Sequence, residues 1–364
     1  MRIARTLAAA GALLLVAILA AAVFSPRFQQ AAFAQAAKHR LARDNSALMK
    51  DDALRVAVCG TSAPLPSKDR AKACVAVIAG GSIYIVDVGP ESVENLMLWN
   101  LPLGRVEGVL LTHFHSDHIG DLGELNLQTW AAGRPSPLVV HGGPGVEEVV
   151  AGFNQAYRLD QGYRTAHHGA AMMPAQTWPL AAHPVILEGS PEGMARTATV
   201  LDDGAMKITA IELSHGPVRP AYAYRFDYKG RSVVVTGDTS AHQPLAVASR
   251  GADVMVAEAL ARPMIRTLET TARDLGRDRV AAIMHDIQDY HASPGEMAAL
   301  ANDAGVRLLV LYHLLPAPDN LLARRLFARD MNRTREGDWT MARDGSLYTL
   351  PLGSKEVRIG RVRG

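Results

Sequence analysis

Short apolar runs separated by turn residues set the pattern of the chain from residue 54 onward. The runs at 54–59, 74–78 and 82–88 have the length of strands, and Gly80-Gly81 between the last two is typical of a hairpin. Further strands are expected at 108–112, 137–140, 206–213, 221–227, 232–236, 254–257 and 308–312. Helical spacing of apolar residues predicts helices at 91–99, 119–129, 262–272, 294–304 and 321–330, and one from Val146. Two strand-rich halves, each backed by helices, predict an α/β fold built as a four-layer αββα sandwich, with its loops collected at one edge.

One stretch, residues 151–204, interrupts this regular order with four prolines. We expect an inserted helical and loop segment there, inside a single domain that spans residues 51–352. A C-terminal tail is expected at 353–364. Residues 27–50 are rich in alanine, glutamine and charge, and they predict a linker or a short helix.

The N-terminal segment, residues 1–26, is distinct from the domain that follows, and it is expected to form a hydrophobic helix. Arg2 and Arg5 precede an uninterrupted apolar run from 6 to 24, which Ser25-Pro26 ends. This pattern is typical of a secretory signal, and the run is about as long as a membrane span. Cleavage near residues 32–34 and retention as an anchor are both open, as is a buried helix of a soluble protein. Export predicts that the following domain is periplasmic, or membrane-anchored and facing the extracytoplasmic side.

Composition limits the range of partners. The chain of 364 residues has a formal net charge of +2 and only 5% aromatic residues. Neither a strong positive field nor a stacking surface is expected, so no nucleic acid is expected as a partner. The two cysteines, Cys59 and Cys74, border neighbouring strands. They can form a disulfide in an oxidising compartment, or they can be two small buried side chains.

Side chains that can bind a metal ion are most concentrated directly after the apolar run 108–111. His113, His115, Asp117 and His118 fall within six consecutive positions. Imidazole and carboxylate together suit zinc and related divalent ions. Burial of such a set without metal would leave many polar groups unsatisfied, so the stretch predicts a metal site.

Three further candidate ligands follow strands elsewhere in the chain: His215, Asp238 and His313. Each has an ordinary alternative, because Gly-Asp-Thr around Asp238 is good turn chemistry and single histidines are often structural. Taken with the first cluster, the set contains five histidines and two aspartates. That number fits two metal ions that share one carboxylate and one water.

The motif from His113 to His118 resembles the metallo-β-lactamase superfamily, and most closely its ribonuclease Z and arylsulfatase-like branch. Residues 60–64 (Gly-Thr-Ser-Ala-Pro), 86–89 (Val-Asp-Val-Gly) and 289–294 (Asp-Tyr-His-Ala-Ser-Pro) also resemble that branch. The resemblance covers nearly all of residues 54–316 and implies the αββα metallo-β-lactamase fold. It implies two divalent metal ions, with zinc as the expected metal. One ion would be held by His113, His115 and His215, the other by Asp117, His118 and His313, with Asp238 as the bridge.

The resemblance also implies roles in catalysis. A hydroxide between the ions would be the nucleophile, and Asp117 would help to orient it. His291 would donate a proton to the leaving group, although the following Ser-Pro-Gly-Glu also indicates an ordinary helix start. Asp87 would orient a ligand imidazole.

The leading hypothesis is an exported metal-dependent hydrolase of a small ester: a phosphodiester, a sulfate ester, or a carboxylic ester or lactone. By the same resemblance, zinc lactamases often have a cysteine ligand where this chain has Asp238, and neither cysteine lies in that region, so a lactamase is disfavoured. His115 stands where the di-iron electron-transfer branch has glutamate, so hydrolysis is favoured over redox chemistry. The first alternative is a ribonuclease Z-like RNA-processing endonuclease, although residues 151–204 contain no basic arm. The second is a metal-binding sensor or assembly factor without turnover. The membrane would be a partner only through an uncleaved N-terminal segment, and a homodimer stays open.

Overall fold

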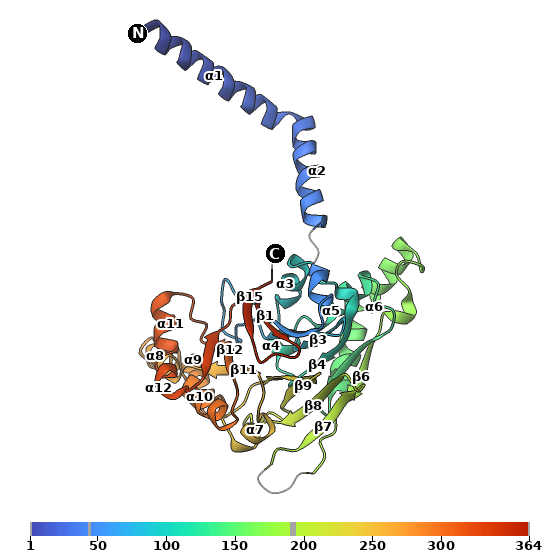
Figure 1. Ribbon diagram of the computed structural model, residues 1–364, viewed down its shortest axis with the longest axis vertical. Helices are drawn as coiled ribbons and strands as arrows, with labels where there is room; N and C mark the ends of the chain where they lie inside the picture. The colour runs from blue at the N-terminus through green and yellow to red at the C-terminus, as the bar shows by residue number, and fades with distance from the viewer. Residues whose placement is uncertain (1, 43–44, 190–193, 363–364) are drawn as a thin grey trace. The chain divides into compact units, whose positions relative to one another are not determined.

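The computed structural model describes residues 2–42, 45–189 and 194–362 (Figure 1). Contacts divide the chain into two units, residues 1–44 and 45–364. The first unit contains α1 (Arg2–Phe24) and α2 (Pro26–Ala42). Helix α2 occupies most of the segment for which a linker or short helix was expected.

The N-terminal helices are long and apolar enough for a membrane span only when two of them are taken together as a bent pair. No single helix among the described residues is long and apolar enough to cross a bilayer, and the two parts of the pair are bent by 70° at the break between them. From Gly11 on, the apolar side chains of α1 are largely exposed, with Leu13 at 71%.

Two mixed sheets form the second unit. The first has eight strands in the order β15-β14-β1-β2-β3-β4-β5-β6. Its strands are β1 (Ala53–Gly60), β2 (Cys74–Ala79), β3 (Ser82–Val86), β4 (Val106–Leu110), β5 (Leu138–Gly142), β6 (Leu180–Pro184), β14 (Ser346–Pro351) and β15 (Arg358–Arg361). Strands β3 to β6 run parallel, so their carboxyl ends meet at one edge.

The second sheet has seven strands in the order β13-β12-β11-β10-β9-β8-β7. Its strands are β7 (Thr197–Asp202), β8 (Met206–Glu212), β9 (Tyr222–Tyr228), β10 (Arg231–Val235), β11 (Val254–Leu260), β12 (Leu308–Leu315) and β13 (Asp338–Met341). Strands β10 to β13 are again parallel, which repeats the arrangement of the first sheet.

Apolar side chains fill three layers between and outside the sheets. Val56, Val77, Phe226 and Val256 belong to the cluster between the two sheets. Figure 1 shows one helical group beside each sheet. The first group is α3 (Ser92–Leu98), α4 (Ser116–Ile119), α5 (Leu122–Ala131) and α6 (Val146–His168); the second is α7 (Gln243–Ala248), α8 (Arg262–Asp274), α9 (Asp278–Asp286), α10 (Pro294–Asp303), α11 (Leu321–Phe327) and α12 (Met331–Thr334). The predicted four-layer αββα sandwich is therefore confirmed.

The expected insertion is more regular than its prolines indicate. It contains the end of α6 and the edge strands β6 and β7, which extend one sheet each. Pro184 is the last residue of β6, a position at which a missing backbone donor costs little. Residues 190–193 of this segment and 363–364 of the expected tail lie outside the described residues.

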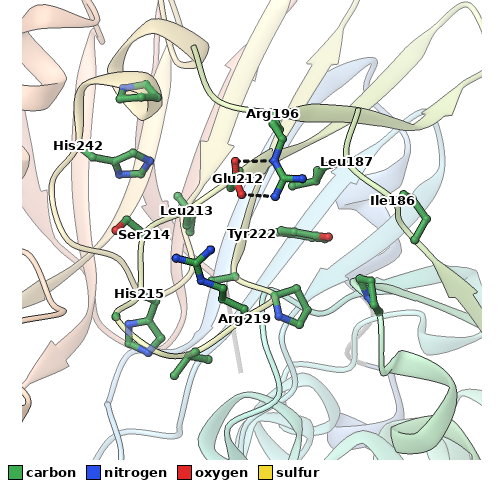
Figure 2. Close-up of a pocket in the computed structure, with 16 residues that line it drawn as sticks. Ile186, Leu187, Arg196, Glu212, Leu213, Ser214, His215, Arg219, Tyr222 and His242 are labelled. Carbon is green, nitrogen blue, oxygen red and sulfur yellow. Dashed lines mark hydrogen bonds and ion pairs between the residues drawn. The ribbon is translucent and has the colours of Figure 1, made fainter. Parts of the chain in front are cut away.

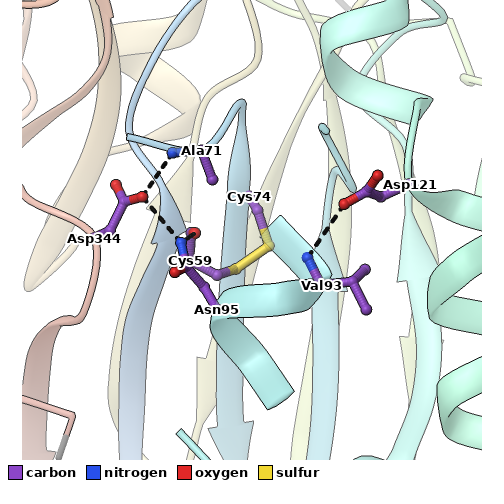
Figure 3. The surroundings of a disulfide bond; sticks show 7 residues. All are labelled: Cys59, Ala71, Cys74, Val93, Asn95, Asp121 and Asp344. Carbon is purple, nitrogen blue, oxygen red and sulfur yellow. Dashed lines mark hydrogen bonds between the residues drawn. A yellow bond between two sulfur atoms is a disulfide. The ribbon is translucent and has the colours of Figure 1, made fainter. Parts of the chain in front are cut away.

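A disulfide joins the two neighbouring strands β1 and β2 (Figure 3). Cys59 and Cys74 are both fully buried, and their sequence separation is 15. The side-chain amide of Asn95 donates to the Cys59 carbonyl at 2.8 Å and to Asp344 at 3.0 Å, which ties α3 to the bridge. The disulfide, left open by the sequence, is thus part of the support beneath the first sheet.

We expect the double variant Cys59→Ala/Cys74→Ala to lose about 3 kcal/mol of unfolding free energy, because the bridge closes a loop of this length in the unfolded chain. Urea denaturation of the oxidised protein and the variant measures the difference. Reduced wild-type protein should approach the variant; equal stability of all three samples would contradict the prediction.

Candidate metal centre

The loop after β4 carries the first four candidate ligands and is fixed by Asp87. The Thr112 backbone N–H and its hydroxyl both donate to the Asp87 carboxylate at 2.8 Å. The same carboxylate lies 2.8 Å from Nδ1 of His118, which leaves Nε2 of that ring to face the site. Asp87 has a left-handed φ of 57°, a conformation that non-glycine residues adopt only where surrounding contacts impose it. The structure thus places Asp87 where the sequence predicted an orienting carboxylate.

The other three candidate ligands come from the second sheet. His215 follows β8, and Asp238 follows β10. His313 was expected just after a strand, but it lies inside β12, where the pairing with β11 shifts register between Glu258 and Ala259. This bulge leaves His313 unpaired with a φ of 42°. Bulges often re-aim a side chain near a functional site, as happens here.

All seven predicted ligand side chains converge, in two groups. The potential donor atoms of His113, His115, His215 and Asp238 lie within 4.8 Å of one another, and so do those of Asp117, His118 and His313. In the first group, Nε2 of His113 lies 2.9 Å from Nδ1 of His115. In the second, Nε2 of His313 is 3.2 Å from both His118 Nε2 and Asp117 Oδ2.

The carboxylate of Asp238 spans the two groups. Its Oδ1 is 3.5 Å from His118 Nε2 and 3.3 Å from His313 Nδ1. Its Oδ2 is 3.9 Å from Nε2 of both His113 and His215. One oxygen therefore faces each group, which is the arrangement that a bridging carboxylate needs.

Unsatisfied polar atoms mark the same place. His215 Nε2, Asp238 Oδ1 and His313 Nδ1 are buried and have no hydrogen-bond partner among the described residues. Burial lowers the pKa of His215 to about 4 and that of His113 well below its usual value, so both rings are neutral and can offer a lone pair. Buried polar groups left unpaired cost free energy, and divalent cations are the partners that this donor set suits. The residues present fit two metal ions.

His291 lies at the side of this centre and is paired with Glu258. Its Nδ1 is 2.9 Å from Glu258 Oε1, and the pair is almost completely buried. Burial disfavours the charged ring, but the Glu258 carboxylate and its hydrogen bond outweigh burial and raise the pKa of His291 to about 9. The backbone N–H of Thr239, next to Asp238, also donates to Glu258 at 2.9 Å. The structure places His291 beside the centre, with a buried carboxylate partner that favours the protonated form of its ring.

Sequence reasoning missed Glu258. It is fully buried in β11, within the otherwise apolar run Val254–Leu260. A lone carboxylate in such a run was a usable signal, because charge is buried only when it is paired.

Comparison with known proteins agrees with this geometry. Residues 68–291 match the model of the family described as "Metallo-beta-lactamase superfamily". The chain belongs to the metallo-beta-lactamase superfamily. Among its curated relatives, ribonuclease Z of Mycobacterium bovis (strain BCG / Pasteur 1173P2) is 34% identical over 267 residues, covering 72% of this chain and 87% of the relative. Ribonuclease Z of Mycolicibacterium paratuberculosis is 33% identical with the same coverage.

Solved structures share the fold of this superfamily member. Human tRNase Z, short form, aligns with a TM-score of 0.57 and 19% identity, covering 82% of this chain and all (100%) of that chain. The metallo-beta-lactamase fold protein YhfI from Bacillus subtilis aligns with a TM-score of 0.55, 19% identity and the same coverage.

The exclusion of nucleic acid as a partner is wrong. It rested on net charge and aromatic content, which are averages over the whole chain, whereas recognition depends on a few local side chains. Similarity to enzymes named ribonuclease Z over 267 residues outweighs such averages.

We expect Asp238→Ala to lose nearly all bound metal, because both groups share its carboxylate. His313→Ala should reduce the content from about two ions per chain to about one, since only the second group loses a ligand. Inductively coupled plasma mass spectrometry of purified protein measures both. His285→Ala is the control, because that side chain is 69% exposed and lies outside the two groups. Full metal content in Asp238→Ala would contradict the bridging role.

Proposed function

We propose that the chain is a metal-dependent phosphodiesterase that cleaves RNA, with zinc as the resident metal. The observation that carries this proposal is the pair of donor groups joined by Asp238, with the buried ring of His291 beside them. Similarity to relatives named ribonuclease Z supports RNA as the substrate class.

Two divalent ions in these groups would neutralise charge on the phosphate and ionise a water molecule at neutral pH. His113, His115 and His215 would hold one ion, and Asp117, His118 and His313 the other. The protein's own residues then fix the geometry. The Asp87 carboxylate accepts from Nδ1 of His118, and the Tyr290 carbonyl accepts from Nδ1 of His215 at 3.1 Å. Nε2 of each ring is therefore the atom that would bind a metal ion.

His291 supplies the proton. Its Nδ1–H donates to Glu258, which leaves Nε2 as the nitrogen that delivers a proton to the departing alkoxide. Glu258 keeps the ring charged and oriented, in the manner of a carboxylate behind a catalytic histidine. Nδ1 of His291 is 4.0 Å from Asp238, so the proton donor and the bridging carboxylate are neighbours.

A second candidate is an exported phosphodiesterase that acts on a small ester. The Cys59–Cys74 disulfide favours it, because such bonds persist mainly outside the cytoplasm. The apolar run of α1 would then direct the chain to the extracytoplasmic side, as a cleaved signal or as an anchor.

Replacing His291 should separate proton donation from metal binding. We expect His291→Ala to lower kcat for bis(4-nitrophenyl) phosphate by about a hundredfold to ten-thousandfold, because general acid catalysis is lost. Glu258→Gln should lower it less, since the ring remains. Metal analysis of the same samples is the control: loss of metal from His291→Ala would make it a ligand instead of a proton donor.

Substrate class is tested with the zinc-loaded full chain on a labelled tRNA precursor, bis(4-nitrophenyl) phosphate, 4-nitrophenyl sulfate and 4-nitrophenyl acetate. We expect cleavage of the RNA and of the phosphodiester. Turnover of small phosphodiesters without RNA cleavage would favour the second candidate, and fusion of residues 1–26 to a reporter active only outside the cytoplasm would then test export. Inactivity toward every phosphodiester with metal bound would overturn both candidates.

A further inference from the structure

A cavity of about 520 Å³ adjoins the metal centre and shares His215 with it (Figure 2). The loop from Leu213 to Ala221 forms one wall, and the backbone N–H of Leu213 donates to the Ala221 carbonyl at 2.8 Å to close that loop. A second bond, from Val218 N–H to the His215 carbonyl at 3.0 Å, tightens it. The same short loop contains the wall residues and His215, so the position of the wall relative to this candidate ligand is set by the loop's own hydrogen bonds.

The loop is also held from outside. Pro220 packs on the turn between β5 and α6, where a Cβ on Gly143 would lie only 2.3 Å from the Pro220 side chain. The Tyr222 N–H donates to the Thr112 carbonyl at 2.9 Å, which ties the cavity to the loop that bears His113. Hydrogen bonds and packing therefore connect the wall of the cavity directly to the loops that carry the candidate metal ligands.

Arg219 is a charged side chain of this cavity that has no hydrogen-bonded partner among the described residues, although its charge contributes, after Arg196, to lowering the pKa of Glu212. The other two charged side chains of the wall, Arg196 and Glu212, pair with each other through two hydrogen bonds, from Nε at 3.0 Å and from Nη2 at 2.5 Å. Arg219 is exposed and makes no hydrogen bond or ion pair with any described residue. A guanidinium whose N–H groups are not used in hydrogen bonds suits a phosphate, which it can bind through two parallel hydrogen bonds.

The rest of the lining is suited to a nucleoside. Ile186, which is 64% exposed, lines the cavity together with Leu187, Pro144 and the ring of Tyr222. These apolar side chains give the cavity a contact surface on which a nucleoside can pack. Mixed apolar walls with one placed charge are typical of ligand sites.

We propose that this cavity is a nucleotide subsite, in which Arg219 binds the phosphate adjacent to the one that is cleaved and the apolar wall receives the intervening nucleoside. This inference rests on the proposed phosphodiesterase function and names the part of the substrate that sets specificity. The cleaved phosphate lies at the metal centre, and its neighbour along the chain reaches the loop 213–221.

The test compares adenosine 3′,5′-bisphosphate with adenosine 5′-monophosphate and adenosine 3′-monophosphate by isothermal titration calorimetry on the zinc-loaded full chain. The bisphosphate can place one phosphate at the metals and the other at Arg219. We expect its Kd to be about tenfold lower than that of either monophosphate, as one added charge-assisted contact implies. Arg219→Ala should bring this ratio close to one, and Arg219→Lys should keep part of it.

Arg250→Ala is the matched control, because the Arg250 side chain is exposed and makes no hydrogen bond or ion pair with a described residue, but it does not line the cavity. It should keep the wild-type ratio. Equal affinities in the wild type, or a ratio that survives Arg219→Ala, would overturn the subsite. Hydrolysis of a phosphodiester without a bisphosphate advantage overturns the subsite alone, whereas absence of any phosphodiester hydrolysis overturns the proposed function.

Discussion

The buried carboxylate of Asp238 is the group on which the arrangement of the site depends. Burial alone would raise its pKa, but the imidazoles of His313 and His118 lower that pKa well below its usual range, so the group is charged at neutral pH. A buried charge is tolerated only when its partners surround it. The imidazoles of His113, His118, His215 and His313 lie within 4 Å of its oxygens and meet that need in part. The polar atoms left without hydrogen bonds indicate that cations complete it.

The sandwich brings these partners together because its parallel strands end at common edges. Strand β4 of the first sheet leads into the loop of His113 and His118, while β10 and β12 of the second supply Asp238 and His313. Each of the two candidate ligand groups draws on both sheets, so neither half of the fold contains a complete group. The apolar side chains packed between the two sheets hold the sheets together, and so they fix the positions of the candidate ligands that follow the strands.

Most of the candidate ligands could be predicted from the sequence because they lie in short local motifs. The ligand loop could be recognised because its residues are contiguous, and His215 and Asp238 because each follows an apolar run. Glu258 and the bulge at His313 escaped, since both depend on how β11 pairs with β12 rather than on either segment alone. The disulfide likewise depends on the register between β1 and β2. Nucleic acid was wrongly excluded because net charge and aromatic content are averages over the whole chain, whereas recognition depends on a few local side chains.

One candidate metal ligand, His215, and the proposed recognition residue Arg219 lie on the same loop, and this limits how the substrate range can change. Members of one fold family differ in substrate through the side chains around a common centre. In this chain, a residue such as Arg219 can be exchanged without moving a ligand, because it is exposed and unpaired. Residues that hold the loop, such as Pro220 against Gly143, cannot change so freely, since their displacement would also move His215. If Arg219 sets specificity as proposed, its substitution would change the substrate range without moving His215, whereas a shift of the loop backbone would affect both residues.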